Sequence, residues 1–217
     1  MDYAAARYKM IQNQIRTNRV TDPLIIAAMS ELPRERFVPD ALQGIAYVDE
    51  DVPLGRGRYL MEPLVTALLL QAAEIDADDV VLDVGCGTGY CSAIIAGMAS
   101  TVVALESDAD LAARAADTFA ELGLNTASVA VGPLGEGWPA QAPYDVIVFG
   151  GAVSAIPPTI TEQLAEGGRM VAVIAAEKGI GCGTLFLHLG GTVSRRPLFD
   201  ASVPLLPGFV PEPTFRF

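Results

Sequence analysis

The chain has little cysteine and almost no histidine. Its 217 residues include three cysteines, Cys86, Cys91 and Cys182, and a single histidine, His188. An odd number of cysteines without a Cys-x-x-Cys pair argues against a disulfide scaffold. Zinc sites take most of their ligands from cysteine and histidine, so we expect no metal site.

Positive charge is also scarce. There are 14 Lys and Arg against 26 Asp and Glu, which gives a formal net charge of −12. Nucleic acids are polyanions that are bound through basic side chains, and an acidic protein repels them at long range. We therefore expect no nucleic-acid partner.

Long apolar runs are absent, although the mean hydropathy of +0.38 is high. A membrane span needs about 20 nearly continuous apolar residues, and the longest candidates, Leu64–Ala73 and Val171–Ala176, are far shorter. The start, MDYAAARYKMIQ, has no apolar signal core. We expect no membrane segment and a cytoplasmic location. The apolar excess fits a dense core or a dimer interface, so monomer and homodimer both stay open.

The first third of the chain is expected to be helical, with one long loop. Apolar residues recur at helical spacing over Ala4–Ile15, and Asp22 before Pro23 is a typical helix start. Prolines and glycines from Pro33 to Arg58 indicate a loop. Pro63 then begins a helix that runs to about Ile75.

The rest of the chain alternates β-branched runs with helical patterns. The predicted strands are Val80–Val84, Val102–Leu105, Ala127–Val131, Asp145–Phe149, Arg169–Ile174, Thr184–His188 and Val193–Leu198. The predicted helices are Tyr90–Met98, Ala109–Leu122 and Thr159–Ala165, and the proline-rich tail, Pro204–Phe217, should be extended. Such alternation implies a parallel sheet covered on both faces, and Gly190-Gly191 joins the last two strands as a hairpin. We therefore predict an α/β, Rossmann-like, doubly wound and mostly parallel sheet of about seven strands in residues 77–217, with residues 1–76 packed on it as an N-terminal helical segment.

A glycine-rich turn follows the first predicted strand. From Asp83 to Gly89 the sequence reads DVGCGTG. Glycines let the backbone turn sharply and approach a ligand closely, and the next helix points its N-terminus at that ligand. Ligands of open α/β sheets bind beyond the carboxyl ends of the strands, where this turn lies. The turn therefore predicts a cofactor site.

Two details indicate which cofactor. The spacing is Gly-x-Gly-x-Gly, whereas dinucleotide-binding enzymes have Gly-x-Gly-x-x-Gly. Asp83 would repel a pyrophosphate but would attract the cationic amino group of a methionine moiety. Glu106, at the end of the second strand, can accept hydrogen bonds from both ribose hydroxyls. We therefore predict S-adenosylmethionine, with NAD as the alternative.

From about Tyr8 to Leu206 the chain resembles the protein-L-isoaspartate O-methyltransferase family. The segments that carry the resemblance include PRERFVP (Pro33–Pro39), AYVDEDVPL (Ala46–Leu54), GWPAQA (Gly137–Ala142) and QLAEGGRMV (Gln163–Val171). The resemblance implies a class I methyltransferase fold, S-adenosylmethionine as methyl donor and S-adenosylhomocysteine as product. It also implies isoaspartyl residues of damaged proteins as acceptors, whose methyl esters collapse to a succinimide and so begin repair.

The glycine turn and the resemblance together predict a set of cofactor contacts. These are Asp83, Gly85, Cys86, Gly87, Thr88, Gly89, Glu106, Ser107, Pro133, Leu134, Tyr59 and Leu60. Pro133 stands where the family has an aspartate that meets the adenine amino group. The backbone N–H of Leu134 could still contact the ring.

One loop departs from the family pattern at the acceptor position. Where the family has Gln-Thr-Ile-Ser-Gln-Pro, this chain reads Arg58-Tyr59-Leu60-Met61-Glu62-Pro63, so Met61 replaces the serine regarded as catalytic. A carboxylate acceptor is already a nucleophile, so methyl transfer depends mainly on alignment. Losing one hydrogen bond to the acceptor would cost about 1–3 kcal/mol, which weakens isoaspartyl activity without abolishing it.

Two arginines flank the altered position. We hypothesise that Arg58 or Arg56 clamps the acceptor carboxylate in place of the missing hydroxyl. The alternative is that both are solvated loop residues. Three functions stay open: an isoaspartyl methyltransferase, a methyltransferase of the same lineage with another acceptor, and a cofactor-binding protein with little catalysis.

Overall fold

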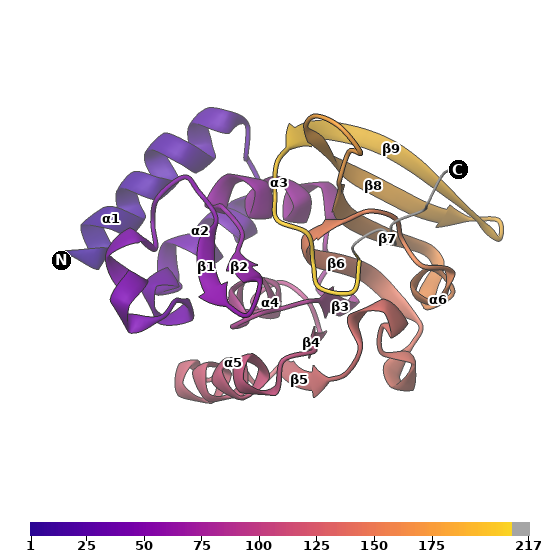
Figure 1. Ribbon diagram of the computed structural model, residues 1–217, viewed down its shortest axis with the longest axis horizontal. Helices are drawn as coiled ribbons and strands as arrows, with labels where there is room; N and C mark the ends of the chain where they lie inside the picture. Colours follow the sequence, from indigo (N-terminus) through magenta and orange to yellow (C-terminus); the bar gives the residue numbers. More distant parts are fainter. Residues whose placement is uncertain (210–217) are drawn as a thin grey trace, which may run out of the picture.

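A seven-stranded sheet organises residues 1–209, the part of the chain that the computed structural model describes (Figure 1). Its order is β5-β4-β3-β6-β7-β8-β9, with β3 to β7 parallel and β8 and β9 antiparallel. The strands are β3 (Val80–Val84), β4 (Thr101–Glu106), β5 (Ala127–Val131), β6 (Tyr144–Val153), β7 (Leu164–Ile174), β8 (Gly181–Leu189) and β9 (Thr192–Ala201). The predicted α/β, mostly parallel sheet and its closing hairpin are confirmed.

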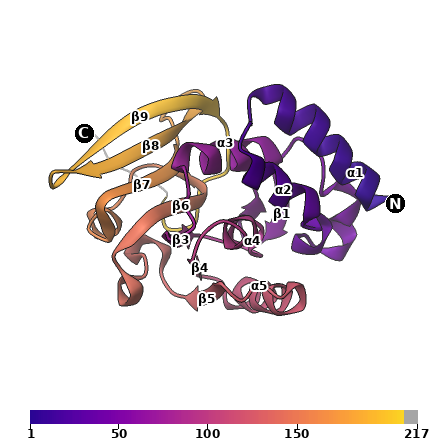
Figure 2. The ribbon, with the colours of Figure 1, turned by 180° about the vertical axis from the view of Figure 1, so that it is seen from behind.

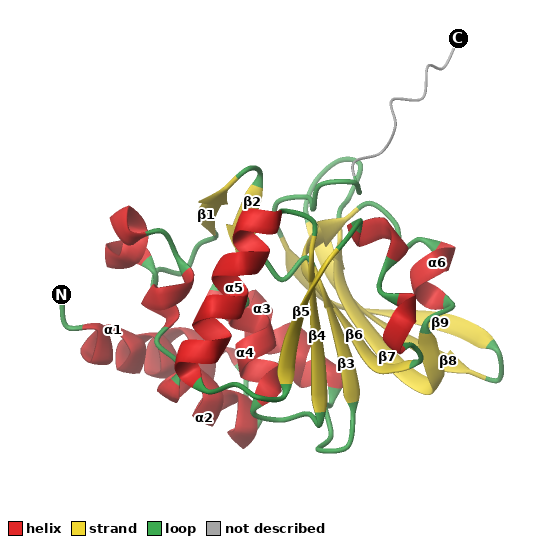
Figure 3. Cartoon of the chain, turned by 90° about the horizontal axis from the view of Figure 1, so that it is seen from below, coloured by secondary structure: helices red, strands yellow, loops and turns green. Residues whose placement is uncertain are grey.

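Both faces of the sheet are covered (Figure 3). On one face lie α3 (Pro63–Ala73), α4 (Tyr90–Ala96) and α5 (Ala109–Leu122), and on the other lie α6 (Pro158–Thr161) and short 3-10 turns. Strand side chains alternate between the faces, so Val81 packs in one apolar cluster while Leu82 and Val84 pack in a second. No helix within residues 1–209 is long and apolar enough to cross a membrane.

The N-terminal part packs against the same core (Figure 2). Helix α1 (Tyr3–Met10) continues through a π-helical turn, Ile11–Ile15, and α2 (Pro23–Glu31) follows. Asp22 caps α2 as expected, since its Oδ1 accepts from Leu24 N at 2.8 Å. The main apolar cluster runs without interruption from these helices into the sheet. The division between residues 1–76 and 77–217 stays a prediction.

Two segments differ from the structure that their local sequence pattern predicts. The expected helix Thr159–Ala165 is only the short α6, because Leu164 already pairs with Tyr144 in the sheet and its side chain is buried. Burial of that strand overrides the helical pattern. The expected loop before Arg58 contains 3-10 turns and ends in an antiparallel hairpin of β1 (Val52–Gly55) and β2 (Arg58–Leu60).

The proline-rich tail lies over the end of β6. Residues 202–209 follow β9, and Leu205 forms an isolated parallel bridge with Ala152. The prediction of an extended tail also covers residues 210–217, which lie outside the described residues.

A buried arginine holds the loop that ends at Met61. Arg34 is fully buried, its Nε donates to Ala46 O at 2.7 Å, and its Nη2 donates to Met61 O at 2.7 Å. Its guanidinium lies 4.6 Å from the centre of the Tyr90 ring, a cation–π contact. Burial lowers the pKa of Arg34. The Arg34 side chain thus connects the backbone at Ala46 and at Met61 to Tyr90 of α4.

Replacing Arg34 by methionine should lower the free energy of unfolding by about 2–4 kcal/mol, because two buried carbonyls lose their donors. Urea unfolding followed by circular dichroism measures the change. The control is Arg36→Met, which removes an exposed ion pair: the side chains of Arg36 and Glu121 are 38% and 59% exposed. This substitution should lower the free energy of unfolding by less than about 0.5 kcal/mol. Equal losses for the two variants would contradict this role of Arg34.

Candidate active site

The glycine turn lies where the sequence predicts it, between β3 and α4. Gly85 N and Cys86 N donate to Leu105 O of β4 at 2.8 and 3.0 Å, which fixes the turn against the neighbouring strand. Gly85, Gly87 and Gly89 have φ values of 78°, 58° and 91°. Side chains other than glycine rarely adopt this conformation.

The turn also lies at the reversal point of the strand order. From β3 the chain goes to β4 on one side and later to β6 on the other, which is where open α/β sheets bind ligands. At this point β6 approaches the turn closely, since a Cβ on Gly150 would lie 2.1 Å from Gly85 O. Only glycine at position 150 permits this contact between the two backbones.

Glu106 ends β4 with its side chain fully buried beside the turn. Its Oε2 accepts from Gly87 N at 2.7 Å, and its Oε1 accepts from Ser107 N at 2.8 Å and Asp108 N at 3.2 Å. The carboxylate therefore reaches the turn as the prediction requires. It also orders the start of the segment that follows β4.

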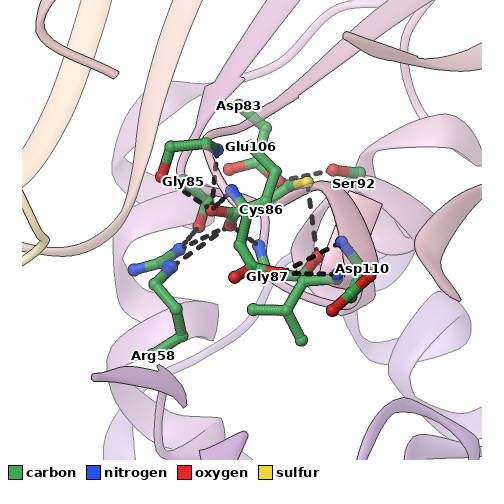
Figure 4. A network of polar contacts seen from close by, with 11 residues as sticks. Arg58, Asp83, Gly85, Cys86, Gly87, Ser92, Glu106 and Asp110 are labelled. Carbon is green, nitrogen blue, oxygen red and sulfur yellow. Dashed lines mark hydrogen bonds and ion pairs between the residues drawn. The ribbon is translucent and has the colours of Figure 1, made fainter. Parts of the chain in front are cut away.

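Arg58 contacts the same carboxylate (Figure 4). Its side chain is 3% exposed, and its Nε and Nη2 lie 3.2 and 3.0 Å from Glu106 Oε2. Nη2 also donates to Gly85 O. Arg56 lies outside, with Nη1 3.2 Å from Asp108 and Nη2 2.5 Å from Asp110. Both guanidiniums thus have carboxylate partners within the chain, and their predicted role as acceptor clamps stays a hypothesis.

Asp83 is the second buried carboxylate of the site. Its Oδ2 accepts from Ser92 Oγ at 2.5 Å, while its Oδ1 has no hydrogen-bond partner among residues 1–209. Burial raises the pKa of Asp83 to about 6, although the Ser92 hydrogen bond and the Arg58 charge act in the opposite direction. Ser92 was not predicted, since only its position on α4 facing β3 brings it to Asp83.

The residues of the altered loop line a very small cavity next to the turn. Its volume is about 20 Å³, room for about one water molecule. The lining comprises Tyr59, Leu60, Met61, Thr66, Gly85, Cys86, Tyr90, Cys91 and Gly150. Burial raises the pKa of the Cys86 thiol well above its usual range, so Cys86 is not an activated nucleophile.

Three further predicted contacts lie at the edges of the site. Thr88 Oγ1 donates to Phe37 O, which ties the turn to the N-terminal part. Gly132 N donates to Glu106 O at 3.1 Å, which brings Pro133 and Leu134 to the end of β4.

Within residues 1–209 there is no group of three or more His, Cys, Asp or Glu side chains placed to hold a metal.

Two leucines that the sequence did not suggest cover the turn. A Cβ on Gly85 would lie 2.9 Å from Leu206 Cδ2 and 2.9 Å from Arg58 Nη2, and a Cβ on Gly87 would lie 2.9 Å from Leu54 Cδ1. Neither leucine is near the turn in sequence. No local pattern could have identified them.

Comparison with known proteins agrees with this geometry. The sequence profile of the protein-L-isoaspartate(D-aspartate) O-methyltransferase (PCMT) family matches residues 5–180. A protein-L-isoaspartate O-methyltransferase 1 of Rhodopseudomonas palustris (strain HaA2) is 37% identical over 176 residues, 81% of this chain and 72% of the relative. A protein-L-isoaspartate O-methyltransferase of Opitutus terrae is 35% identical over 205 residues, 94% of this chain and 85% of the relative.

Solved structures show the same fold. A protein-L-isoaspartate O-methyltransferase structure superposes with a TM-score of 0.80 at 25% identity and covers 93% of this chain and 66% of that one. A Plasmodium falciparum structure named as a beta-aspartate methyltransferase (PCMT) in complex with S-adenosyl-L-homocysteine also has a TM-score of 0.80, at 19% identity, and covers 95% and 98%. The predicted resemblance is confirmed: the chain belongs to the protein-L-isoaspartate(D-aspartate) O-methyltransferase family.

Proposed function

We propose that the chain is an S-adenosylmethionine-dependent O-methyltransferase that acts on the carboxylate of isoaspartyl residues in proteins or peptides. The assignment of the cofactor rests on two buried carboxylates, Asp83 and Glu106, that lie on either side of the glycine turn. Family membership supports the acceptor. The net charge of −12 supports a protein acceptor over a nucleic acid.

The chemistry of the site fits this cofactor. The unpartnered Oδ1 of Asp83 suits a cationic amino group, which would satisfy a buried acceptor that has no other partner. Glu106 suits the ribose hydroxyls, and the positive-φ glycines leave room for close approach to the backbone.

When bound, the cofactor supplies a methyl group on a sulfonium. The protein needs no general base, since a carboxylate acceptor is already ionised, and its contribution is alignment and exclusion of water. Leu60 and Met61 of the altered loop supply no side-chain donor to the cavity lining, whereas Thr66 and Tyr90 of that lining each carry a hydroxyl group. In this proposal Arg56 or Arg58 binds the acceptor carboxylate after exchanging its present partner.

One observation favours a second acceptor class. Met61 is 4% exposed and presents a thioether where the family's serine would present a hydroxyl. A methyltransferase of the same lineage with an acceptor that needs no hydroxyl contact is the alternative. Monomer and homodimer fit both proposals.

The purified chain should release S-adenosylhomocysteine when it is incubated with S-adenosylmethionine and an isoaspartyl peptide. The matched control is the same peptide with a normal aspartyl linkage, which should give only background. Release with a cell extract but not with the isoaspartyl peptide would refute the proposed acceptor while leaving methyl transfer intact.

Restoring the hydroxyl should improve isoaspartyl activity. Met61→Ser should raise kcat/KM for an isoaspartyl peptide by about 5- to 100-fold, the equivalent of one recovered hydrogen bond. Met61→Ala is the control, because it removes the same bulk without adding a donor. If both variants gain equally, the effect comes from space and not from the hydroxyl.

Binding of S-adenosylhomocysteine should strengthen as the pH rises from about 5 to about 7, because Asp83 must lose its proton to pair with an amino cation and its pKa is about 6. Because the pKa of Asp83 is higher in the folded chain than in the unfolded chain, the folded chain holds this proton more tightly. The free energy of unfolding should therefore fall as the pH rises from about 4 to about 6. Calorimetric titration across this range measures the affinity. Asp83→Asn should bind more weakly, with no comparable pH dependence, and an unchanged pH profile in that variant would exclude Asp83 as the cause.

A further inference from the structure

The carboxylate proposed to bind the ribose already has a cationic partner. Glu106 Oε2 accepts from Arg58 Nε, Arg58 Nη2 and Gly87 N, while Oε1 faces Ser107 and Asp108. A carboxylate has about four lone-pair positions, so no acceptor capacity remains for two ribose hydroxyls. The Arg58 guanidinium also lies against Gly85, where a cofactor would approach the turn.

A second side chain covers the turn from the opposite end of the sequence. The segment that carries it is bonded along the end of β6, with Ala152 N donating to Pro204 O at 3.0 Å and Leu206 N donating to Ala152 O at 2.8 Å. Leu206 is 1% exposed and lies against both Gly85 and Gly151. Phe209 then packs edge-on against Phe149, which secures the segment.

We propose that Arg58 and Leu206 form an internal latch on the cofactor site, and that S-adenosylmethionine binds only after Arg58 gives up Glu106. The inference rests on the proposed function. It accounts for the small size, about 20 Å³, of the cavity that remains between the altered loop and Gly85.

The exchange at Glu106 lowers cofactor affinity. Hydrogen bonds between a guanidinium and a carboxylate are charge-assisted and stronger than those from neutral hydroxyls. Cofactor binding must therefore replace strong contacts with weaker ones at this carboxylate. The released Arg58 remains on the loop that carries Met61, so its cation becomes available to an acceptor carboxylate only when the cofactor is in place.

Affinity for S-adenosylhomocysteine, measured by calorimetric titration, tests the latch. Arg58→Ala should lower the Kd about ten-fold relative to the unaltered chain, because the competing cation is gone. Arg58→Lys should give an intermediate Kd, since it keeps the charge but loses the paired donors. Leu206→Ala should also lower the Kd, by a smaller factor.

The control is Arg169→Ala. Arg169 pairs with Asp79 just before β3, at the opposite end of the strands, and the two side chains are 21% and 10% exposed. Its loss should lower the melting temperature of the free protein, as Arg58→Ala should, but should leave the Kd unchanged. A lower Kd in Arg169→Ala would mean that the loss of any such ion pair strengthens cofactor binding, and would overturn the latch.

The remaining outcomes separate the latch from the proposed function. An equal or higher Kd in Arg58→Ala, with binding still measurable, overturns the latch and leaves the cofactor assignment standing. Absence of binding in the unaltered chain and in every variant overturns both. If Arg58→Ala does not fold, Arg58→Lys and Leu206→Ala decide, and an unchanged Kd in both overturns the latch.

Discussion

The buried carboxylate of Glu106 is the point on which the site depends. It bonds the glycine turn through Gly87 N, orders the segment after β4 through Ser107 and Asp108, and pairs with Arg58 of β2. A buried charge is stable only when it is paired and hydrogen-bonded. The glycine turn, β4 and the altered loop are therefore held in one arrangement.

The altered loop is held from two sides. Arg34 fixes its backbone at Ala46 and Met61, and Arg58 fixes its end at Glu106. The first contact is made to backbone carbonyls and does not depend on the cofactor site, whereas the second is made within it. This division lets the loop keep its place while one side chain changes partner, which is the physical basis for coupling the cofactor to the acceptor.

Family membership and the site chemistry address different questions. Membership rests on similarity over most of the chain and supports the acceptor class. The glycine turn with Asp83 and Glu106 supports the cofactor. Met61 bears on both questions, because it stands where the resemblance predicts a serine hydroxyl, and in the proposed function an arginine aligns the acceptor instead. A carboxylate acceptor tolerates this change because its nucleophilicity needs no proton transfer.

Much of the architecture was readable from the sequence because it depends on local periodicity. Alternating β-branched runs and helical repeats predicted the sheet, and the Gly-x-Gly-x-Gly spacing with Asp83 and Glu106 predicted the cofactor site. The helix expected over Thr159–Ala165 failed because pairing of Leu164 with Tyr144 outweighs a short helical pattern.

The sequence by itself determined the fold class, because alternating strand and helix patterns are short-range, and it determined the family through similarity over most of the chain. Only the tertiary structure decided that Arg58 pairs with Glu106 and that Leu206 lies on Gly85. These partners are 48 and 121 positions apart along the chain. Contacts over such separations depend on strand order and on the path of the terminal segment, which no local pattern encodes.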